Sequence, residues 1–359
     1  MSAERDCSIN GVYDSTIKNN VPLNVLFELT YRCNLRCGHC YNADSGEKEL
    51  SYYEVKDIVE QLAAENCLFL TFTGGEALVR EDFLDIARCA RRMGFALKLF
   101  TNGSLIDEGI ARELAGLKPV HVGISIYGAD AAVHDRLTGV PGSFHRSLHA
   151  LRILHDYGVL TMLKCLLMKE NIAQLDAIMF LAAEVGAILQ LDPVVNPKND
   201  GNRGPLQHEV NEAALYRLFS NEKDWPKKPK DSLAQPSRSL LCRAGIDTCS
   251  ISPGGEVYPC VALPVPLGNL REQSFAKVWH GARAREMRKF RLSDLQQCVS
   301  CPDLDYCTRC WGLAAVESGN HLGPSYLNCR IARIRHRISE ERGANNSQRE
   351  EVVNHEATI

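Results

Sequence analysis

Long apolar runs are absent from this sequence of 359 residues. No uninterrupted apolar segment approaches the roughly 20 residues that a membrane-spanning helix requires. The first ten residues, MSAERDCSIN, lack the apolar core of a secretory signal peptide. Excess charge of one sign is also absent, and a net charge of −3 indicates neither a nucleic-acid nor a membrane-surface partner. We therefore expect a cytoplasmic protein with no nucleic-acid and no membrane partner.

Cysteine, in contrast, is abundant, with fifteen residues in the chain. Structural disulfides are not expected in a reducing compartment, so metal binding or redox use is the better explanation. Cys67, Cys89 and Cys165 lie singly in apolar or helical patterns, which is typical of buried free thiols because cysteine packs like a small hydrophobe. Eleven others gather in two fields, residues 33–40 and 242–329.

The first 220 residues alternate short apolar runs with helical patterns. The expected strands are 24–30, 67–73, 95–101, 120–126, 159–167 and 187–191. The expected helices are 51–65, 81–93, 106–117, 145–157 and 171–185. Ser51 and Glu54 form a capping box at the start of the first of these helices. Such alternation favours parallel strands joined by right-handed crossovers. Six units are fewer than the eight of a closed barrel, so we predict an α/β fold, a partial (β/α)6 TIM-like barrel over 24–220.

The rest of the chain divides into four segments. Residues 1–23 form an N-terminal segment, and residues 221–240 are rich in Pro, Lys and Ser, which is typical of a linker. Residues 241–335 are rich in cysteine and turn-forming residues, so we expect a small domain that needs metal to hold it together. The charged tail 336–359 is expected to be a frayed helix end followed by disorder.

Three cysteines, Cys33, Cys37 and Cys40, follow the first expected strand. Three thiolates suit an iron–sulfur cluster with one open iron better than a structural zinc site, which takes four ligands. Residues 74–76, Gly-Gly-Glu, follow the second strand; glycines permit close backbone approach, and a carboxylate accepts hydrogen bonds from an ammonium group. Because parallel strands end at one mouth, the two motifs should face one another. For the cysteine spacing alone, a zinc site or a chance match stays an alternative.

Together these motifs resemble the signature of the radical S-adenosylmethionine (SAM) superfamily. The resemblance implies a 4Fe-4S cluster on the three cysteines, with SAM on its open iron. It also implies that GGEAL at 74–78 binds the amino group of SAM, although Ala77 stands where the family more often has proline. TNGS at 101–104 and ISIYG at 124–128 resemble the ribose-side and carboxylate-side contacts. The SAM-binding residues implied are His39, near the adenine, with Gly74, Gly75, Glu76, Asn102 and Ser125.

The second cysteine field resembles the SPASM extension of radical SAM enzymes, which typically carries two auxiliary 4Fe-4S clusters. By this resemblance Cys242, Cys249, Cys260 and Cys310 hold auxiliary cluster I. Cys298, Cys301, Cys307 and Cys329 then hold auxiliary cluster II. Two residues separate Cys307 from Cys310, where the family usually has three. Whether Cys249 binds auxiliary cluster I is left open. The alternative is a four-cysteine zinc knuckle made by 298, 301, 307 and 310, which leaves the other four cysteines unexplained.

The resemblance implies an enzyme with three 4Fe-4S clusters and SAM as cofactors. An external one-electron reductant of flavodoxin or ferredoxin type feeds the SAM cluster, and a 5′-deoxyadenosyl radical then takes a hydrogen atom from the substrate. SPASM enzymes mostly modify ribosomally made peptides, and oxidative peptide modification is the favoured function. Two alternatives are a small molecule, such as a tetrapyrrole of heme-type biosynthesis, and a non-catalytic iron–sulfur protein. Pure electron carriers need no amino-acid pocket, so Gly-Gly-Glu argues against the latter.

Four further features bear on the reaction. Val261 stands where sulfatase-maturing members have a catalytic aspartate, which argues against formylglycine formation. No catalytic residue is identified; Asp192 is as well explained by a turn as by a base. The long Pro/Gly/Asn stretch 191–206 either lines the substrate opening or is a solvated surface loop. About 25 residues precede the first strand, too few for a leader-binding domain, so a separate leader-binding protein is a possible partner.

Overall fold

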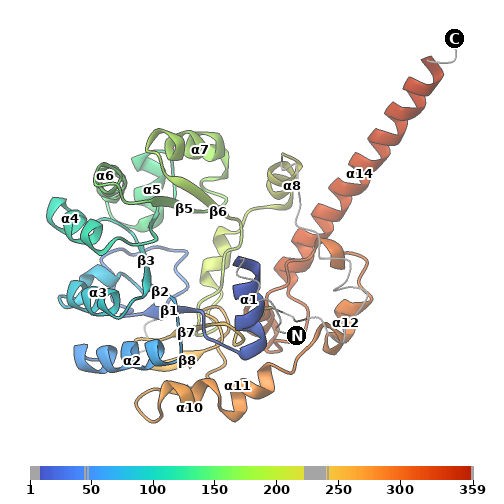
Figure 1. The fold of residues 1–359 in the computed structure, drawn as a ribbon. Helices are drawn as coiled ribbons and strands as arrows, with labels where there is room; N and C mark the ends of the chain where they lie inside the picture. The colour runs from blue at the N-terminus through green and yellow to red at the C-terminus, as the bar shows by residue number, and fades with distance from the viewer. Residues whose placement is uncertain (1–8, 44–45, 47, 222–239, 241, 357–359) are drawn as a thin grey trace. The chain divides into compact units, whose positions relative to one another are not determined.

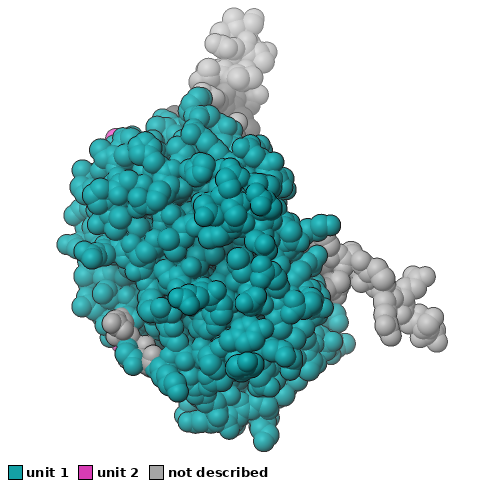
Figure 2. All heavy atoms as spheres, turned by 90° about the vertical axis from the view of Figure 1, so that its left-hand side faces the viewer, with its two compact units in different colours: residues 1–209, 242–290 teal, residues 210–241, 291–359 magenta. Residues whose placement is uncertain are grey.

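The computed structural model describes residues 9–43, 46, 48–221, 240 and 242–356. The chain forms two compact units, coloured in Figure 2. Unit 1 contains residues 1–209 and 242–290, and unit 2 contains residues 210–241 and 291–359. No helix in the described part of the chain combines the length and apolar character needed to cross a membrane.

Unit 1 is built on one nine-stranded sheet with the order β6-β5-β4-β3-β2-β1-β7-β8-β9 (Figure 1). Neighbours from β6 to β1 run parallel, as predicted for a partial barrel. The six strands of this core are β1 (Asn24–Glu28), β2 (Phe69–Thr73), β3 (Ala96–Thr101), β4 (His121–Ser125), β5 (Thr161–Leu166) and β6 (Ile188–Asp192). Each lies within one residue of an expected strand or inside it, so the α/β prediction is confirmed.

Helices follow the strands of the core on the outer side of the sheet (Figure 1). The helices of unit 1 are α1 (Ile9–Asn19), α2 (Tyr52–Ala64), α3 (Phe83–Arg92), α4 (Glu108–Leu117), α5 (Ala131–Thr138), α6 (Ser143–Asp156), α7 (Leu175–Glu184), α10 (Phe275–Trp279) and α11 (Ala282–Met287). The five expected helices are confirmed, and so is the Ser51–Glu54 capping box at the start of α2. Helices α1, α5, α10 and α11 were not expected; the short sequence of α5 offers less than three turns of periodicity.

The two faces of this sheet differ in chemistry because side chains alternate along a strand. One face carries buried apolar residues such as Phe27, Leu99 and Leu163, which pack beneath the helices. Figure 2 looks onto that helix-covered side and shows the side chains of unit 1 closing it. The opposite face, which we call the inner face, carries polar and aromatic residues. In register from β1 to β6 these include Glu28, Thr73, Lys98, Phe100, His121, Ser125, Lys164 and Asp192.

The sheet continues beyond β1 with residues from the cysteine-rich region. Strand β7 (Thr248–Ile251) runs parallel to β1, with Val25 opposite Cys249. Strands β8 (Glu256–Tyr258) and β9 (Gly268–Asn269) then add antiparallel neighbours. Residues 242–290 therefore extend the sheet of unit 1. The predicted linker, 221–240, lies almost entirely outside the described residues.

Unit 2 contains α8 (Glu212–Ser220), α12 (Gln296–Val299), α13 (Trp311–Ser318) and α14 (Tyr326–Glu356). For the tail 336–359 we expected a frayed helix end followed by disorder; in the structure α14 continues to Glu356. Ile338 is buried, Arg337 pairs with Glu212, and Arg342 donates to the carbonyl oxygen of Ser220 at 2.7 Å. Helix α8 thus stabilises this charged part of α14, whose residues have good helix propensity.

Candidate functional site

The three cysteines of the first motif lie in one loop between β1 and α2, the cluster loop, residues 29–50. The amide of Cys40 donates to the carbonyl oxygen of Cys37 at 3.2 Å, and the amide of Leu35 donates to Cys33 Sγ at 3.4 Å. Burial, together with the neighbouring Cys40 and Cys33, raises the pKa of Cys37 to about 12. The thiols therefore lie close enough to oppose one another's ionisation. A cationic metal centre removes that penalty, and an all-thiol donor set suits an iron–sulfur cluster.

No three Cys, His, Asp or Glu side chains in the described ranges are arranged to hold a single metal ion. In a four-iron cluster each thiolate binds a different iron, so the ligands stand further apart than around one ion. The cluster loop consequently fits a four-iron cluster because its donor atoms are all thiols and because these thiols lie close together.

Arg80 holds the two ends of the cluster loop together. Its buried guanidinium donates from Nη1 to the carbonyl oxygens of Leu29 at 3.1 Å and Leu50 at 2.9 Å. The same group pairs with Asp82 at 2.7 Å. Leu29 ends the β1 region and Leu50 precedes α2, so one side chain fixes both anchors of the loop. Nothing in the sequence around Arg80 marks it for this role, and the sequence analysis missed it.

The Gly-Gly-Glu motif packs directly on the cluster loop. Gly74 has φ +138°, and a Cβ built there would lie 2.2 Å from the carbonyl oxygen of Thr30. A Cβ on Gly75 would lie 2.5 Å from the carbonyl oxygen of Arg32. Gly75 N donates to Thr30 O at 2.7 Å, and Glu76 N donates to Arg32 O at 2.9 Å. The glycines were expected because they let another group come close to the backbone of the motif. In the structure that group is the backbone of the cluster loop.

Glu76 is 1% exposed, and both of its carboxylate oxygens accept hydrogen bonds from the chain. The donors are the amide of Leu78 at 3.1 Å, the amide of Asn102 at 2.7 Å and the hydroxyl of Thr101 at 2.8 Å. Burial raises the pKa of Glu76, and these hydrogen bonds oppose the shift. A carboxylate has about four acceptor positions. Three donated hydrogens therefore leave about one position for an ammonium group, and they tie β2 to the turn after β3.

Asn102 points its amide toward the cluster loop. Its Nδ2 donates to Asn34 Oδ1 at 2.8 Å and lies 3.9 Å from Cys33 Sγ. Its Oδ1 accepts from the amide of Ser104 at 2.8 Å, and Asn34 Nδ2 donates to Ser104 Oγ at 2.8 Å. Hydrogen bonds to cluster sulfurs are one of the means by which proteins tune cluster potential. The side chain thus orients Cys33; its contact with the ribose stays a prediction.

His39 is buried between aromatic neighbours. Its ring centroid lies 4.3 Å from that of Tyr127, edge to face, and 6.3 Å from that of His208. Burial and then the nearby His208 and His134 lower the pKa of His39 to about 3, so the ring is neutral. Its Nδ1 is buried without a hydrogen-bond partner in the described structure. A neutral ring beside the cysteines suits a contact with adenine, which remains a prediction.

The stretch 191–206 lies against the cluster loop. The amide of Asn199 donates to Tyr41 O at 2.9 Å, and the amide of Ala43 donates to Asn199 Oδ1 at 3.0 Å. Asp192 accepts from the amide of Val194 at 2.9 Å, which is the turn role that the sequence offered as an alternative to a base. Of the two explanations offered for this stretch, a purely solvated loop is therefore the weaker.

Ser125 ends β4 on the inner face, directly opposite Lys164 of β5. Burial lowers the pKa of Lys164 to about 8, and Asp192 opposes the shift. A cation beside the serine that is predicted to meet the SAM carboxylate is a further candidate for the same contact. The sequence analysis missed Lys164 because only the pairing of β4 with β5 brings it next to Ser125.

Glu28 is a buried carboxyl at the end of β1. Tyr41 donates to its Oε1 at 3.0 Å, and Tyr31 donates to its Oε2 at 3.3 Å. Burial raises the pKa of Glu28 to about 7, and the two tyrosines oppose the shift. Tyr41 directly follows Cys40, so this network supports the far end of the cysteine motif.

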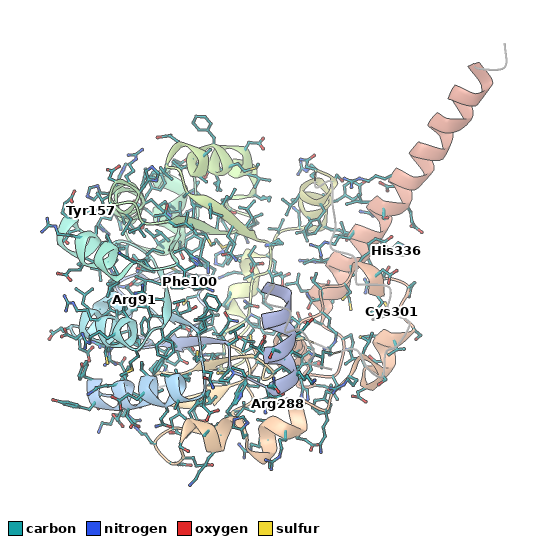
Figure 3. The ribbon with its side chains drawn as sticks, in the orientation of Figure 1. Arg91, Phe100, Tyr157, Arg288, Cys301 and His336 are labelled. Atoms are coloured by element: carbon teal, nitrogen blue, oxygen red, sulfur yellow. The ribbon has the colours of Figure 1, made fainter. Side chains whose placement is uncertain are left out.

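In unit 2, three cysteines predicted for auxiliary cluster II lie near one another. Cys298 and Cys301 (labelled in Figure 3) pack against a small buried leucine cluster, and Cys301 N donates to Cys298 O at 3.1 Å. Burial and then the neighbouring Cys298 raise the pKa of Cys329, with Cys301 contributing. Cys307 closes the turn after Leu304, whose carbonyl oxygen accepts from its amide at 3.2 Å. Their role as ligands stays a prediction.

In unit 1, Cys249 is 1% exposed on β7. Burial raises its pKa, with smaller effects from Cys67, Arg288 and Cys260. Cys242 Sγ accepts from the amide of Ala244 at 3.3 Å. Cys310, the fourth residue predicted for auxiliary cluster I, belongs to unit 2, and the complete set remains a prediction.

Comparison with known proteins decides the family. The profile of the radical SAM superfamily matches residues 27–182, and that of the SPASM iron–sulfur cluster-binding domain matches residues 242–311. A mycofactocin maturase, MftC, of Mycolicibacterium smegmatis is 30% identical over 80% of this chain and 77% of its own. The chain belongs to the radical SAM superfamily. It is a radical SAM enzyme of the SPASM subfamily, with a 4Fe-4S cluster, SAM and auxiliary iron–sulfur clusters as cofactors.

Two further similar proteins are a heme synthase and a protein of known structure. An AdoMet-dependent heme synthase of Methanosarcina barkeri is 29% identical over 84% of this chain and 95% of its own. The crystal structure of Streptococcus suis SuiB bound to its precursor peptide SuiA superimposes with a TM-score of 0.68 at 18% identity, covering 92% of this chain and 83% of that one. The second likeness establishes the shared fold.

Proposed function

We propose that this radical SAM enzyme oxidatively modifies a ribosomally synthesised peptide, forming a crosslink, a thioether or a related product of C–H functionalisation. The supporting observation is the 30% identity to a mycofactocin maturase over most of both chains. The subtilosin biosynthesis protein AlbA of Bacillus subtilis, at 28% identity over 81% of this chain, adds to it.

In this proposal Cys33, Cys37 and Cys40 hold the SAM cluster. The remaining acceptor position of Glu76 takes the amino group of SAM, and Ser125 with Lys164 takes its carboxylate. His39 and Asn102 flank the nucleoside, and Gly74 and Gly75 keep the motif against the cluster loop. The cluster and SAM, once bound, supply one-electron cleavage of SAM and removal of a hydrogen atom from an unactivated carbon.

The auxiliary clusters fit an oxidative reaction. A substrate that has lost a hydrogen atom must lose one more electron, with a proton, to end as a closed-shell oxidised product. The two predicted cysteine sets provide places for an acceptor of that electron. The proposal includes two partners besides the peptide: a flavodoxin- or ferredoxin-type reductant and a separate leader-peptide-binding protein.

A second candidate is the same chemistry on a tetrapyrrole side chain. The observation in its favour is the M. barkeri heme synthase, of which the aligned region covers 95%. A non-catalytic iron–sulfur protein is not retained, because the family is enzymatic.

Anaerobically reconstituted protein should be incubated with SAM and dithionite, and 5′-deoxyadenosine measured by liquid chromatography. Two substrate arms follow, one with short peptides encoded beside the gene and one with propionate-bearing tetrapyrroles, both read by mass spectrometry. Loss of hydrogen from a peptide supports the proposal, and modification of the tetrapyrrole alone favours the second candidate. Cys37→Ala is the control, and absence of 5′-deoxyadenosine from the unaltered chain contradicts both.

A further inference from the structure

Two basic residues lie side by side on the inner face, away from the cluster loop. Lys98 of β3 and His121 of β4 are register partners, so their side chains project from the same face. Lys164 of β5 projects from that face as well, one strand further on. All three residues are partly exposed.

Aromatic rings pack against these basic groups. Lys98 Nζ lies 4.4 Å from the centroid of the Phe69 ring, and Lys164 Nζ lies 3.3 Å from that of Phe100. The His121 ring stacks on Phe100 with centroids 6.0 Å apart and planes at 26°. Gly123 permits this, because a Cβ there would lie 2.9 Å from both Phe100 Cδ1 and Lys164 Cδ. The result is a patch of the inner face with apolar surface between basic groups.

This patch is short of negative charge. Burial lowers the pKa of Lys98. Burial and then the positive charges of Lys98 and Lys164 lower the pKa of His121. The acidic groups of the same face lie elsewhere: Asp192 acts on Lys164, and Glu28 belongs to the tyrosine network on β1. His121 Nε2 is buried without a hydrogen-bond partner in the described structure.

A lysine charge beside an unpartnered buried ring nitrogen is unfavourable until an anion joins them. We propose that Lys98 and His121 bind a carboxylate group of the substrate between the rings of Phe69 and Phe100. One ammonium and one ring N–H match the two oxygens of a single carboxylate. The flanking rings suit an acid with an apolar stem.

This inference rests on the proposed function, because the ligand is the substrate of the same enzyme, and it specifies the group recognised. A peptide supplies such a group as an Asp or Glu side chain or as a C-terminus, and a small organic acid supplies it directly. The binding test below involves no turnover. Failure of the radical chemistry and failure of the carboxylate subsite are therefore separate results.

Benzoate and its neutral isostere benzamide are suitable probes. They are titrated by calorimetry, without reductant, into reconstituted holoenzyme saturated with SAM. Benzoate should bind at least about tenfold more tightly than benzamide, a difference of about 1.4 kcal/mol. Lys98→Gln and His121→Gln should each remove most of this preference, and Lys98→Arg should retain it. Lys56→Gln, an exposed lysine of α2, is the matched control and should leave the preference unchanged.

Circular dichroism and iron content establish that each variant is folded and loaded before titration. Equal binding of the two probes, or binding of neither, overturns the proposal. The proposal is also overturned if benzoate displaces SAM and Lys98→Gln weakens SAM binding. Lys98 and His121 would then bind the cofactor and not the substrate. To separate the two sources of carboxylate, peptides ending in a carboxylate or a carboxamide are then compared with benzoate in competition, and their relative affinity assigns the source.

Discussion

Replacing Gly74 with alanine tests whether the Gly-Gly-Glu motif shapes the cluster loop. The new Cβ would lie 2.2 Å from Thr30 O, at a φ of +138° that L-residues rarely adopt. Backbone strain of this kind is about 1–3 kcal/mol. Moving the strand end also endangers the hydrogen bonds Gly75 N–Thr30 O and Glu76 N–Arg32 O, each worth about 0.5–1.5 kcal/mol. We expect Gly74→Ala to destabilise unit 1 by about 2–6 kcal/mol in all.

Two other glycines separate strain from contact. Gly94 has φ +94° with nothing within 4 Å, so Gly94→Ala should show strain alone, about 1–3 kcal/mol. Gly116, inside α4, has open space and no positive φ, so Gly116→Ala should be stabilising by about 0.5–1 kcal/mol.

Urea unfolding of the three variants and iron analysis after anaerobic reconstitution provide the measurement. Gly74→Ala should lose the iron of one cluster and the SAM-dependent change in its paramagnetic resonance spectrum, while Gly94→Ala should keep both. Full iron in Gly74→Ala, with an unfolding midpoint equal to that of Gly94→Ala, would refute the reasoning.

Three further predictions concern single side chains. Burial raises the pKa of Glu28 from 4.5 to about 7, so the folded protein holds the proton of this carboxyl more tightly than the unfolded chain does. The stabilisation from the protonated Glu28 is therefore complete below pH 4.5. It is lost, up to about 3 kcal/mol, as the pH rises through about 7. Glu28→Gln should remove this loss in urea unfolding, and an unchanged pH profile would contradict it. Arg80→Ala should lower the free energy of unfolding by about 3–5 kcal/mol, because it leaves Asp82 unpaired and frees both ends of the cluster loop. Arg88→Ala, which removes only exposed ion pairs, should lower it by at most about 1 kcal/mol. Urea unfolding of the two variants measures the difference. Cys329→Ser should lose auxiliary-cluster iron while the buried Cys165→Ser keeps it, and equal iron in both would remove Cys329 from the ligand set.

The strands and the chemical motifs are encoded locally, which is why sequence patterns predicted them. Alternation of short apolar runs with helical periods is repeated six times, and each strand end carries its polar motif within a few residues. Donor chemistry is equally local, since three thiols within eight residues limit the choice of metal before any fold is known. The continuation of α14 beyond residue 336 was missed because its middle turns are stabilised by α8, more than 100 residues earlier in the chain.

The order of the elements, the position of each motif at a strand end and the nature of its donor atoms can all be read from the residues in order. Which groups meet across strands cannot be read in this way: Arg80 on both ends of the cluster loop, Asn102 on Asn34, Lys164 beside Ser125, and Lys98 beside His121. Such contacts depend on strand register and crossover geometry, which place residues tens of positions apart within a few ångströms. No local pattern of residues carries that information.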